Sequence, residues 1–85
     1  MSETPGVINL RVVGTTGITY KILIENQNIT IRELKEMISE KSAIPVNVFN
    51  LTYQGKNLVD NLKINDYSIV NNSVIHCIEF TEGGN

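Results

Sequence analysis

The chain has 85 residues, of which 41% are hydrophobic and 19% are charged, and its formal net charge at pH 7 is −2. A chain of this length holds one small hydrophobic core, and this composition is typical of a folded domain rather than a disordered tail. The weakly acidic balance argues against nucleic acid as a partner, because nucleic-acid-binding domains usually carry a basic face. The single cysteine excludes an internal disulfide framework and a thiolate metal cage, so we expect neither a metal nor a cofactor.

No apolar run approaches the ~18 residues that a membrane-spanning helix needs, and the polar residues 1–6 do not have the pattern of a signal peptide. We therefore expect a monomer without a membrane partner, in the cytosol or the nucleus, where a lone cysteine stays reduced. Residues 1–6 are expected to form a flexible leader, and the polar, glycine-containing residues 81–85 a flexible tail. One domain then remains, over residues 7–80.

Residues 7–25 alternate between apolar and polar side chains on both sides of a Gly14-Thr15-Thr16-Gly17 turn, in which both glycines are expected at positive φ. The even positions form one apolar face, consisting of Ile8, Leu10 and Val12 before the turn and of Ile18, Tyr20, Ile22 and Ile24 after it. This pattern predicts a β-hairpin. Because a lone hairpin is barely stable in water, another element must cover the apolar face.

A helix over about residues 30–42 is the expected cover. Thr30 and Glu33 match the capping-box pattern that opens a helix. Ile31, Leu34 and Ile38 are spaced three and four apart, so they share one face. The polar residues Arg32, Glu33, Lys35, Glu36, Glu40 and Lys41 are expected to fill the rest of the helix surface. Pro45 is expected to end the helix, because the residue before a proline is pushed out of the α region.

The second half of the chain predicts two further strands and one helical turn. Phe49, Leu51 and Tyr53 alternate as a short third strand. Residues 54–57 turn the chain into a brief segment around Leu58, residues 64–67 resemble one helical turn, and residues 74–80 form the last strand. The fold class is therefore α+β. Parallel pairing of the first and last strands at the sheet centre would complete a β-grasp.

The residues that carry a family resemblance are Ile44-Pro45, Leu51, Tyr53-Gln54-Gly55-Lys56-Asn57-Leu58, Asp60, Asp66-Tyr67-Ser68-Ile69 and Ser73-Val74-Ile75-His76. They resemble ubiquitin and its relatives over about residues 7–84. Some features, such as Tyr-Gln-Gly and Val-Ile-His, are similar to the N-terminal ubiquitin-like domains of ubiquilin- and Scythe-type adaptors, and the opening Ile-Asn-Leu-Arg-Val-Val-Gly is similar to SUMO. The resemblance implies a ubiquitin-like β-grasp: a mixed sheet of about five strands with one main helix packed across it.

The expected core combines the apolar faces of these elements. It contains Ile8, Leu10, Val12, Ile22, Ile24, Ile31, Leu34, Ile38, Leu51, Leu58, Ile69, Ile75 and Cys77. The family further implies that the Tyr67 hydroxyl is hydrogen-bonded to backbone near Leu58–Asp60. His76 and Cys77 are consecutive on a strand and must point to opposite faces, so they cannot form a catalytic dyad and we expect no enzyme. Cys77 is expected to be a small buried hydrophobe.

The last strand also predicts a binding surface. Its even residues Val74, His76, Ile78 and Phe80 should lie on the sheet face opposite the helix, together with Val13 of the first strand. That face is normally polar in a small antiparallel or mixed sheet. An apolar strip there favours a protein-binding site, with scattered surface apolar residues as the alternative.

The resemblance sharpens this expectation. The main partner surface of ubiquitin falls here on Thr15, Thr52, Gly55, His76 and Ile78, and the last three match. The expected partners are ubiquitin-binding helices and proteasome or chaperone receptors. Ubiquitin has leucine and isoleucine at the two threonine positions, so ordinary binding to such helices and to proteasome receptors should be weakened by around 1–3 kcal/mol. Phe80 could compensate by moving the surface along the strand. Lys56 matches a chain-forming lysine of ubiquitin, or is a charged turn residue.

The tail leaves a rival function open. Gly83 and Gly84 fall in the register of ubiquitin's terminal diglycine, and Asn85 comes after them. In a modifier, a processing protease removes the chain beyond Gly84, and activating and conjugating enzymes join the glycine to lysines of target proteins. Phe80 and Glu82 stand where ubiquitin has arginines, although a SUMO-type tail also lacks them, and two glycines are equally typical of a linker. We therefore expect an adaptor domain in ubiquitin- and proteasome-linked quality control, with a modifier precursor as the alternative and a stand-alone binding subunit as a third possibility.

Overall fold

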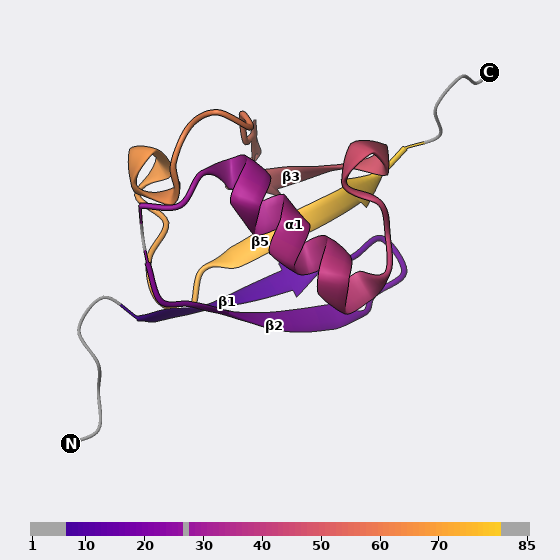
Figure 1. Cartoon of the computed structure of the whole chain (residues 1–85). Coiled ribbons are helices and arrows are strands. Elements are labelled where there is room, and N and C mark those ends of the chain that lie inside the picture. The colour runs from indigo at the N-terminus through magenta and orange to yellow at the C-terminus, as the bar shows by residue number, and fades with distance from the viewer. Residues whose placement is uncertain (1–6, 27, 81–85) are drawn as a thin grey trace.

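The computed structural model describes residues 7–26 and 28–80, which form a mixed five-stranded sheet with one helix across one of its faces (Figure 1). The elements are β1 (Ile8–Val13), β2 (Thr19–Ile24), α1 (Ile31–Ser42), β3 (Phe49–Tyr53), β4 (Lys56–Asn57) and β5 (Val74–Glu79). The expected α+β ubiquitin-like β-grasp is thus confirmed. The expected leader (1–6) and tail (81–85) lie outside the described residues.

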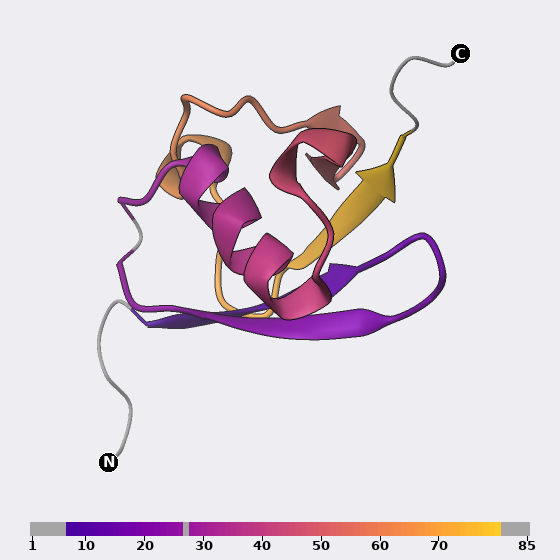
Figure 2. The same ribbon diagram turned by 45° about the vertical axis from the view of Figure 1, so that its right-hand side comes forward.

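The strand order β2-β1-β5-β3-β4 places the last strand in the middle of the sheet. β1 pairs antiparallel with β2 and parallel with β5, in the register Val12 to Ile75, and β5 pairs antiparallel with β3. The parallel central pair that a β-grasp requires is therefore present. Figure 2 shows the β1–β2 hairpin on one side of the molecule and α1 packed over the sheet.

The β1–β2 hairpin forms as expected, with two differences at its turn. Ile18 is exposed rather than inward-facing, because its carbonyl accepts a hydrogen bond from the Gly14 N–H at 2.8 Å and it precedes the first residue of β2. Gly17 has the expected positive φ of 90°, but Gly14 is not among the positive-φ residues. One glycine thus supplies the conformation that we expected from two.

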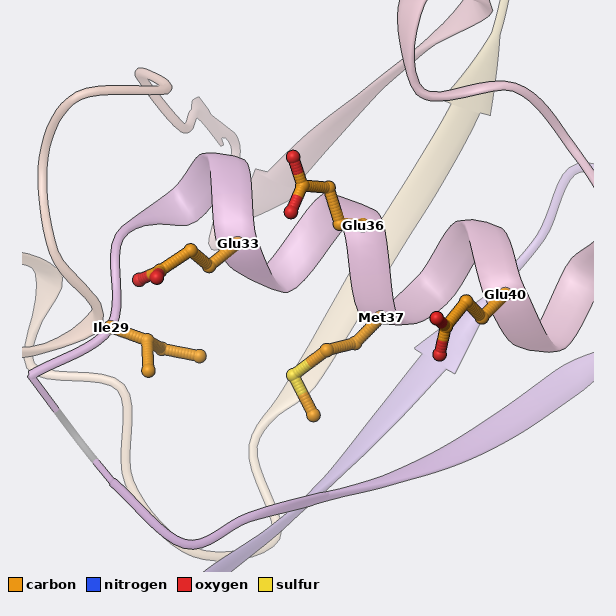
Figure 3. Close-up of a pocket in the computed structure, with 5 residues that line it drawn as sticks. All are labelled: Ile29, Glu33, Glu36, Met37 and Glu40. Carbon is orange, nitrogen blue, oxygen red and sulfur yellow. The ribbon is translucent and has the colours of Figure 1, made fainter.

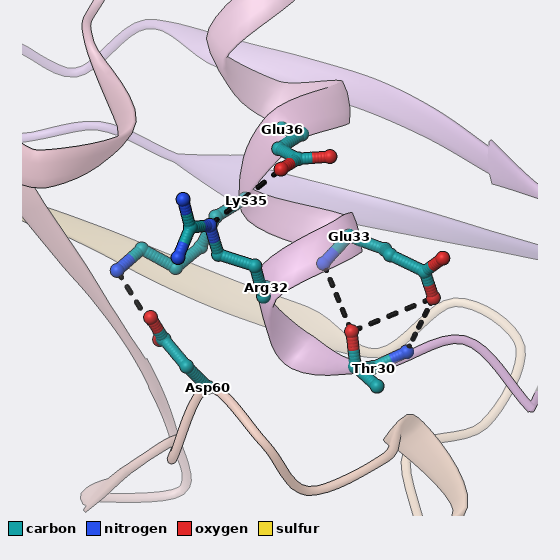
Figure 4. A network of polar contacts seen from close by, with 6 residues as sticks. All are labelled: Thr30, Arg32, Glu33, Lys35, Glu36 and Asp60. Carbon is teal, nitrogen blue, oxygen red and sulfur yellow. Dashed lines mark hydrogen bonds and ion pairs between the residues drawn. The ribbon is translucent and has the colours of Figure 1, made fainter.

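The helix begins as the sequence predicts. The Thr30 hydroxyl accepts from the Glu33 N–H at 3.1 Å, and the Glu33 carboxylate accepts from the Thr30 N–H at 2.9 Å (Figure 4). These two bonds satisfy donors that every helix N-terminus leaves free. Of the helices in the described residues, none combines the length and the apolar character that crossing a membrane requires.

The helix ends at Ser42, as expected, but Pro45 does not end it. Ala43, two residues before Pro45, adopts the left-handed conformation with φ 64°, and its N–H donates to the Ser39 carbonyl at 2.8 Å. Pro45 instead precedes a 3-10 turn, Val46–Val48, that leads into β3. The chain therefore leaves the helix at Ala43, and the proline only prevents its continuation.

The core is fully confirmed for the thirteen residues that we expected, each of which is buried. Two further residues belong to it: Phe49 at the start of β3 and Ile64 in the 3-10 turn Ile64–Tyr67. That turn is present as predicted. The Tyr67 hydroxyl accepts a hydrogen bond from the Val59 N–H at 2.8 Å, which confirms the expected bond between Tyr67 and the Leu58–Asp60 backbone.

Lys35 corrects the expectation that all charged helix residues lie at the surface. Its side chain is buried and its ammonium lies 3.3 Å from an Asp60 carboxylate oxygen (Figure 4) and 5.6 Å from the centroid of the Phe49 ring. A long side chain can bury its methylene groups and still bring its charge to a partner. Lys35 thus connects α1 to the loop after β4.

Candidate docking face on the sheet

The two faces of β5 differ as the sequence predicts. Ile75 and Cys77 are 0% and 2% exposed, on the side that α1 covers. Val74, Ile78 and the following Phe80 are 40%, 45% and 40% exposed on the opposite side. The expected split of this strand between a sealed and an open surface is confirmed. We call the outward-facing set Val13, Val74, His76, Ile78 and Phe80 the outer strip.

The register of the sheet places the members of the outer strip next to one another. His76 lies opposite Val13 on β1 and opposite Thr52 on β3, so these three form one row across the sheet. Val74 lies opposite Arg11. Val13 and Thr52 are only partly exposed, so they offer less surface to a partner than the exposed members of the strip do.

Ile78 and Phe80 extend the strip toward the C-terminal end of β5. Ile78 lies opposite Asn50. Phe80 follows the strand, and its N–H donates to the Val48 carbonyl at 2.9 Å, which holds this residue against the turn before β3. The apolar surface therefore runs past the point at which Thr52 interrupts it.

Gly55 and Lys56 lie at the margin of the face. Gln54 and Gly55 form the two-residue β3–β4 turn, with φ angles of 53° and 81°. Such a turn needs positive φ at both positions, which glycine adopts without strain. Lys56 lies opposite Tyr53 and not opposite Thr52, so it is outside the Thr52–His76 row. Thr15 is exposed in the β1–β2 turn.

Cys77 and His76 do not form a reactive pair, because the thiol is buried under α1 and the imidazole is exposed on the other face. Burial raises the pKa of the Cys77 thiol; the Glu79 carboxylate raises it further, and Lys35 lowers it in part. A thiol with a raised pKa is a poor nucleophile at neutral pH. The arrangement gives Cys77 a packing role.

A hollow of about 320 Å³ lies on the helix side of the molecule (Figure 3). Its lining consists of Ile29, Glu33, Glu36, Met37 and Glu40. Two of these carboxylates already have partners, since Glu33 caps the helix and Glu36 pairs with Arg32 at 3.5 Å. Within the part of the chain that the structure describes, no three histidine, cysteine or acidic side chains are grouped to hold a metal ion.

Sequence reasoning missed one part of the sheet face. A smaller hollow, of about 180 Å³, lies beside the outer strip and is lined by Asn9, Leu10, Arg11, Lys21 and Asn72. Arg11 and Lys21 occupy odd positions of the hairpin, opposite in parity to the buried residues, so their outward direction was available from the alternation. That they lie directly opposite each other follows only from the register.

Comparison with known proteins assigns this chain to a family. Residues 8–79 match the sequence profile of the Ubiquitin family, and the chain belongs to that family. Relatives include the NEDD8-like protein RUB3 of Arabidopsis thaliana, which is 38% identical over 55 residues (65% of this chain and 70% of the relative). The ubiquitin-like protein NEDD8 of Dictyostelium discoideum is 35% identical over 54 residues (64% and 70%).

Solved structures agree with this assignment. The UBL domain of Plasmodium falciparum Dsk2 superposes with a TM-score of 0.81 at 27% sequence identity, covering 86% of this chain and 97% of that domain. A designed protein based on ubiquitin superposes with a TM-score of 0.83, covering 96% and 99%, and at 22% identity it supports the fold alone. The chain is thus a ubiquitin-like domain with similarity both to NEDD8-like proteins and to a UBL domain.

Proposed function

We propose that this ubiquitin-like domain is a non-enzymatic protein-interaction module that binds its partners through the outer strip. Its setting in this proposal is ubiquitin- and proteasome-linked protein quality control, in the cytosol or the nucleus. The observation that supports it most is the exposure of Val74, Ile78 and Phe80 on one strand, at 40%, 45% and 40%. The structural similarity to the UBL domain of Dsk2 favours the adaptor type.

Energetics support a binding role for the outer strip. Each of these side chains leaves apolar surface in water, and its burial against a partner is favourable by about 25 cal/mol per Å². Polar residues could occupy the same outward positions without harm to the core, because the core lies on the other face of β5. The strip is therefore unnecessary for folding and suited to docking.

The partner in this proposal is an amphipathic helix or a receptor surface with apolar side chains. Thr52 stands where ubiquitin has isoleucine, beside His76 in the same row. Its hydroxyl group lowers the apolar contact at the centre of the face. Ile78 and Phe80 supply that contact toward the end of β5, so the partner should lie closer to the C-terminal end of the strand than it does on ubiquitin.

Chemical-shift mapping tests the proposal. The ¹⁵N-labelled domain is titrated with a ubiquitin-binding helix, and amide shifts are recorded for every residue. We expect the largest changes at His76, Ile78 and Phe80, with Thr52 affected less. Saturating peptide without any change at His76 or Ile78 would exclude the outer strip as the docking site.

The second candidate function is that of a ubiquitin-like modifier precursor. The similarity to NEDD8-like proteins favours it, and so does the position of Gly83 and Gly84 in the sequence. These two glycines lie outside the described residues. In this reading a protease cleaves after Gly84, and activating and conjugating enzymes transfer the glycine carboxylate to a lysine.

A thioester assay separates the two candidates. The chain without Asn85 is incubated with an activating enzyme and ATP, and the products are run on a non-reducing gel. A thiol-sensitive adduct that is absent from the Gly84→Ala variant supports the modifier. A chain that forms no adduct, yet shows the expected shifts at His76 and Ile78, supports the adaptor.

A further inference from the structure

The β1–β2 hairpin carries two positive charges side by side on the outer face. Arg11 and Lys21 are paired directly opposite each other in the antiparallel register. At such positions the Cβ atoms lie about 5 Å apart, and like charges destabilise the sheet. Both side chains are exposed. The repulsion between the two charges therefore lowers the stability of the fold, so the pair is not there to stabilise the hairpin.

None of the outward-facing positions in the described strands carries an acidic side chain that could balance this pair. The outward-facing strand positions are Asn9, Arg11, Val13, Thr19, Lys21, Leu23, Asn50, Thr52, Asn57, Val74, His76 and Ile78, and none of them is acidic. The ion pairs within residues 7–26 and 28–80 lie elsewhere, at Arg32–Glu36 and Lys35–Asp60. Glu25 has the same parity as Lys21 but lies four residues further on, about 13 Å along an extended chain.

The outward face of the sheet therefore has a local excess of positive charge. Although the chain has a net charge of −2, the outward strand positions carry only positive charge. A surface with such a local excess attracts a partner of the opposite sign.

The two cations also line a hollow with further donors. Asn9 and Asn72 also line the 180 Å³ depression at Arg11 and Lys21, and Asn9 Nδ2 donates to Asn71 Oδ1 at 3.4 Å. Hydrogen bonds hold the rim of this depression: the Asn9 N–H donates to the Asn71 side-chain Oδ1 at 2.7 Å, and the Asn72 N–H donates to the Asn9 carbonyl at 2.7 Å. Guanidinium and ammonium N–H groups around one hollow suit a carboxylate.

We propose that this hollow binds a carboxylate of an acidic partner segment whose apolar side chains dock on the outer strip. Arg11 lies opposite Val74, about 4.8 Å away across the strands, and Lys21 lies one strand further. An acidic residue three or four positions from an apolar anchor on a partner helix has this separation. The inference rests on the proposed function and defines the partner as an acidic amphipathic protein segment.

The experiment compares two synthetic amphipathic helices that share an apolar stripe. One carries glutamates beside the stripe, and the other carries glutamines. Both are titrated into the labelled domain, into its Lys21→Glu variant and into Lys41→Glu, a matched charge reversal at an exposed residue of α1. Thermal unfolding of each variant is measured in parallel.

We expect the glutamate helix to shift Arg11, Lys21 and Asn72 together with Val74 and Ile78. Lys21→Glu should weaken its binding by about five- to tenfold, whereas Lys41→Glu should change it by less than about twofold. The same Lys21→Glu variant should raise Tm by about 1–4 °C, because it places opposite charges across the strands. Weaker binding of the glutamate helix together with a higher Tm in Lys21→Glu would show that Lys21 serves docking and does not stabilise the fold.

Equal binding of the glutamate and glutamine helices at Val74 and Ile78 would leave the proposed function intact and overturn this inference. The inference would also be overturned if Lys21→Glu and Lys41→Glu changed the affinity for the glutamate helix by the same factor. Absence of shifts at Val74, His76 and Ile78 with either helix would contradict the proposed function, and the inference with it. A single-stranded oligonucleotide is titrated as a rival partner. Larger shifts at Arg11 and Lys21 with the oligonucleotide than with the glutamate helix would overturn the inference, because the hollow would then bind nucleic acid and not an acidic protein segment.

Discussion

At the scale of single residues, Lys35 shows how a charged side chain can become part of a core. The Lys35 ammonium lies over the Phe49 ring and is 3.3 Å from a carboxylate oxygen of Asp60. The Asp60 side chain is 47% exposed. Because the lysine is buried and the aspartate is not, the two ends of this ion pair do not contribute equally. Removal of Asp60 leaves a buried charge without its partner, whereas removal of Lys35 leaves a carboxylate that water can solvate.

We therefore expect asymmetric effects on the free energy of unfolding. Asp60→Asn should lower it by about 1–3 kcal/mol, a range reduced from that of a fully buried pair because Asp60 is half exposed. Lys35→Met should change it by no more than about 1 kcal/mol, because a similar apolar volume is kept. Urea unfolding followed by circular dichroism measures both. A greater loss for Lys35→Met than for Asp60→Asn would show that the ion pair is not organised around the buried lysine.

Cys77 gives the domain a pH dependence on the alkaline side. Burial and Glu79 raise the pKa of its thiol in the folded state. The unfolded thiol ionises above roughly pH 8.5, where the folded thiol still keeps its proton. The thiol's contribution to stability is therefore complete below that pH and is lost as pH rises toward the folded pKa.

We expect the free energy of unfolding to fall above about pH 8.5 by up to 1.4 kcal/mol per pH unit from this one group. The Cys77→Ala variant should lack this component of the slope, whatever the other titrating groups contribute to both proteins. Parallel urea titrations between neutral and alkaline pH measure the difference. Identical slopes for the two proteins would mean that the thiol is not desolvated as the structure indicates.

At the scale of elements, alternation and helix capping predicted most of this fold. The two faces of β1, β2 and β5 follow from period-two alternation, and the start of α1 follows from Thr30 and Glu33. The exposure of Ile18 did not follow, because hydrogen bonds within the turn, not alternation, determine it. Ile64 was missed because a single helical turn is too short to show a period.

The candidate site was predictable to a similar degree. The direction of Val74, His76 and Ile78 needed only the parity of one strand, whereas the Arg11–Lys21 pair needed the register between two strands. Lys35 could not be placed by pattern, since a lysine at a partly inward helix position can extend either to solvent or to a buried acid. The sequence pattern therefore predicted the strands and the helix, but not the register between strands or the contacts between side chains of different elements.

The end of α1 provides a prediction at this scale. Ala43 has φ 64° and ψ 21°, a conformation that costs a side-chain-bearing residue about 1–2 kcal/mol and that glycine adopts freely. Ala43→Gly should raise the free energy of unfolding by about 0.5–1 kcal/mol once the greater freedom of glycine in the unfolded chain is subtracted. Thermal unfolding measures this change, and a lower Tm for Ala43→Gly would contradict the left-handed helix end.

At the scale of the whole molecule, one sheet separates two chemically different surfaces. The face under α1 is apolar, continuous and sealed, and the residues that form it explain why the chain folds. The opposite face combines the outer strip with the Arg11–Lys21 pair. Neither feature of that face contributes to the core, so both can be changed without loss of the fold.

The central claim is that the open side of β5 binds a partner, and the affinity of the Ile78→Asp variant for a ubiquitin-binding helix tests it most directly. Val59→Asp is the matched control, because Val59 is 49% exposed and Ile78 45%. We expect Ile78→Asp to weaken binding by at least about tenfold with an unchanged folded spectrum, and Val59→Asp to bind as the unmodified domain does. Equal affinity for all three proteins would contradict the account, and unfolding of Ile78→Asp would show that this side of β5 is part of the core.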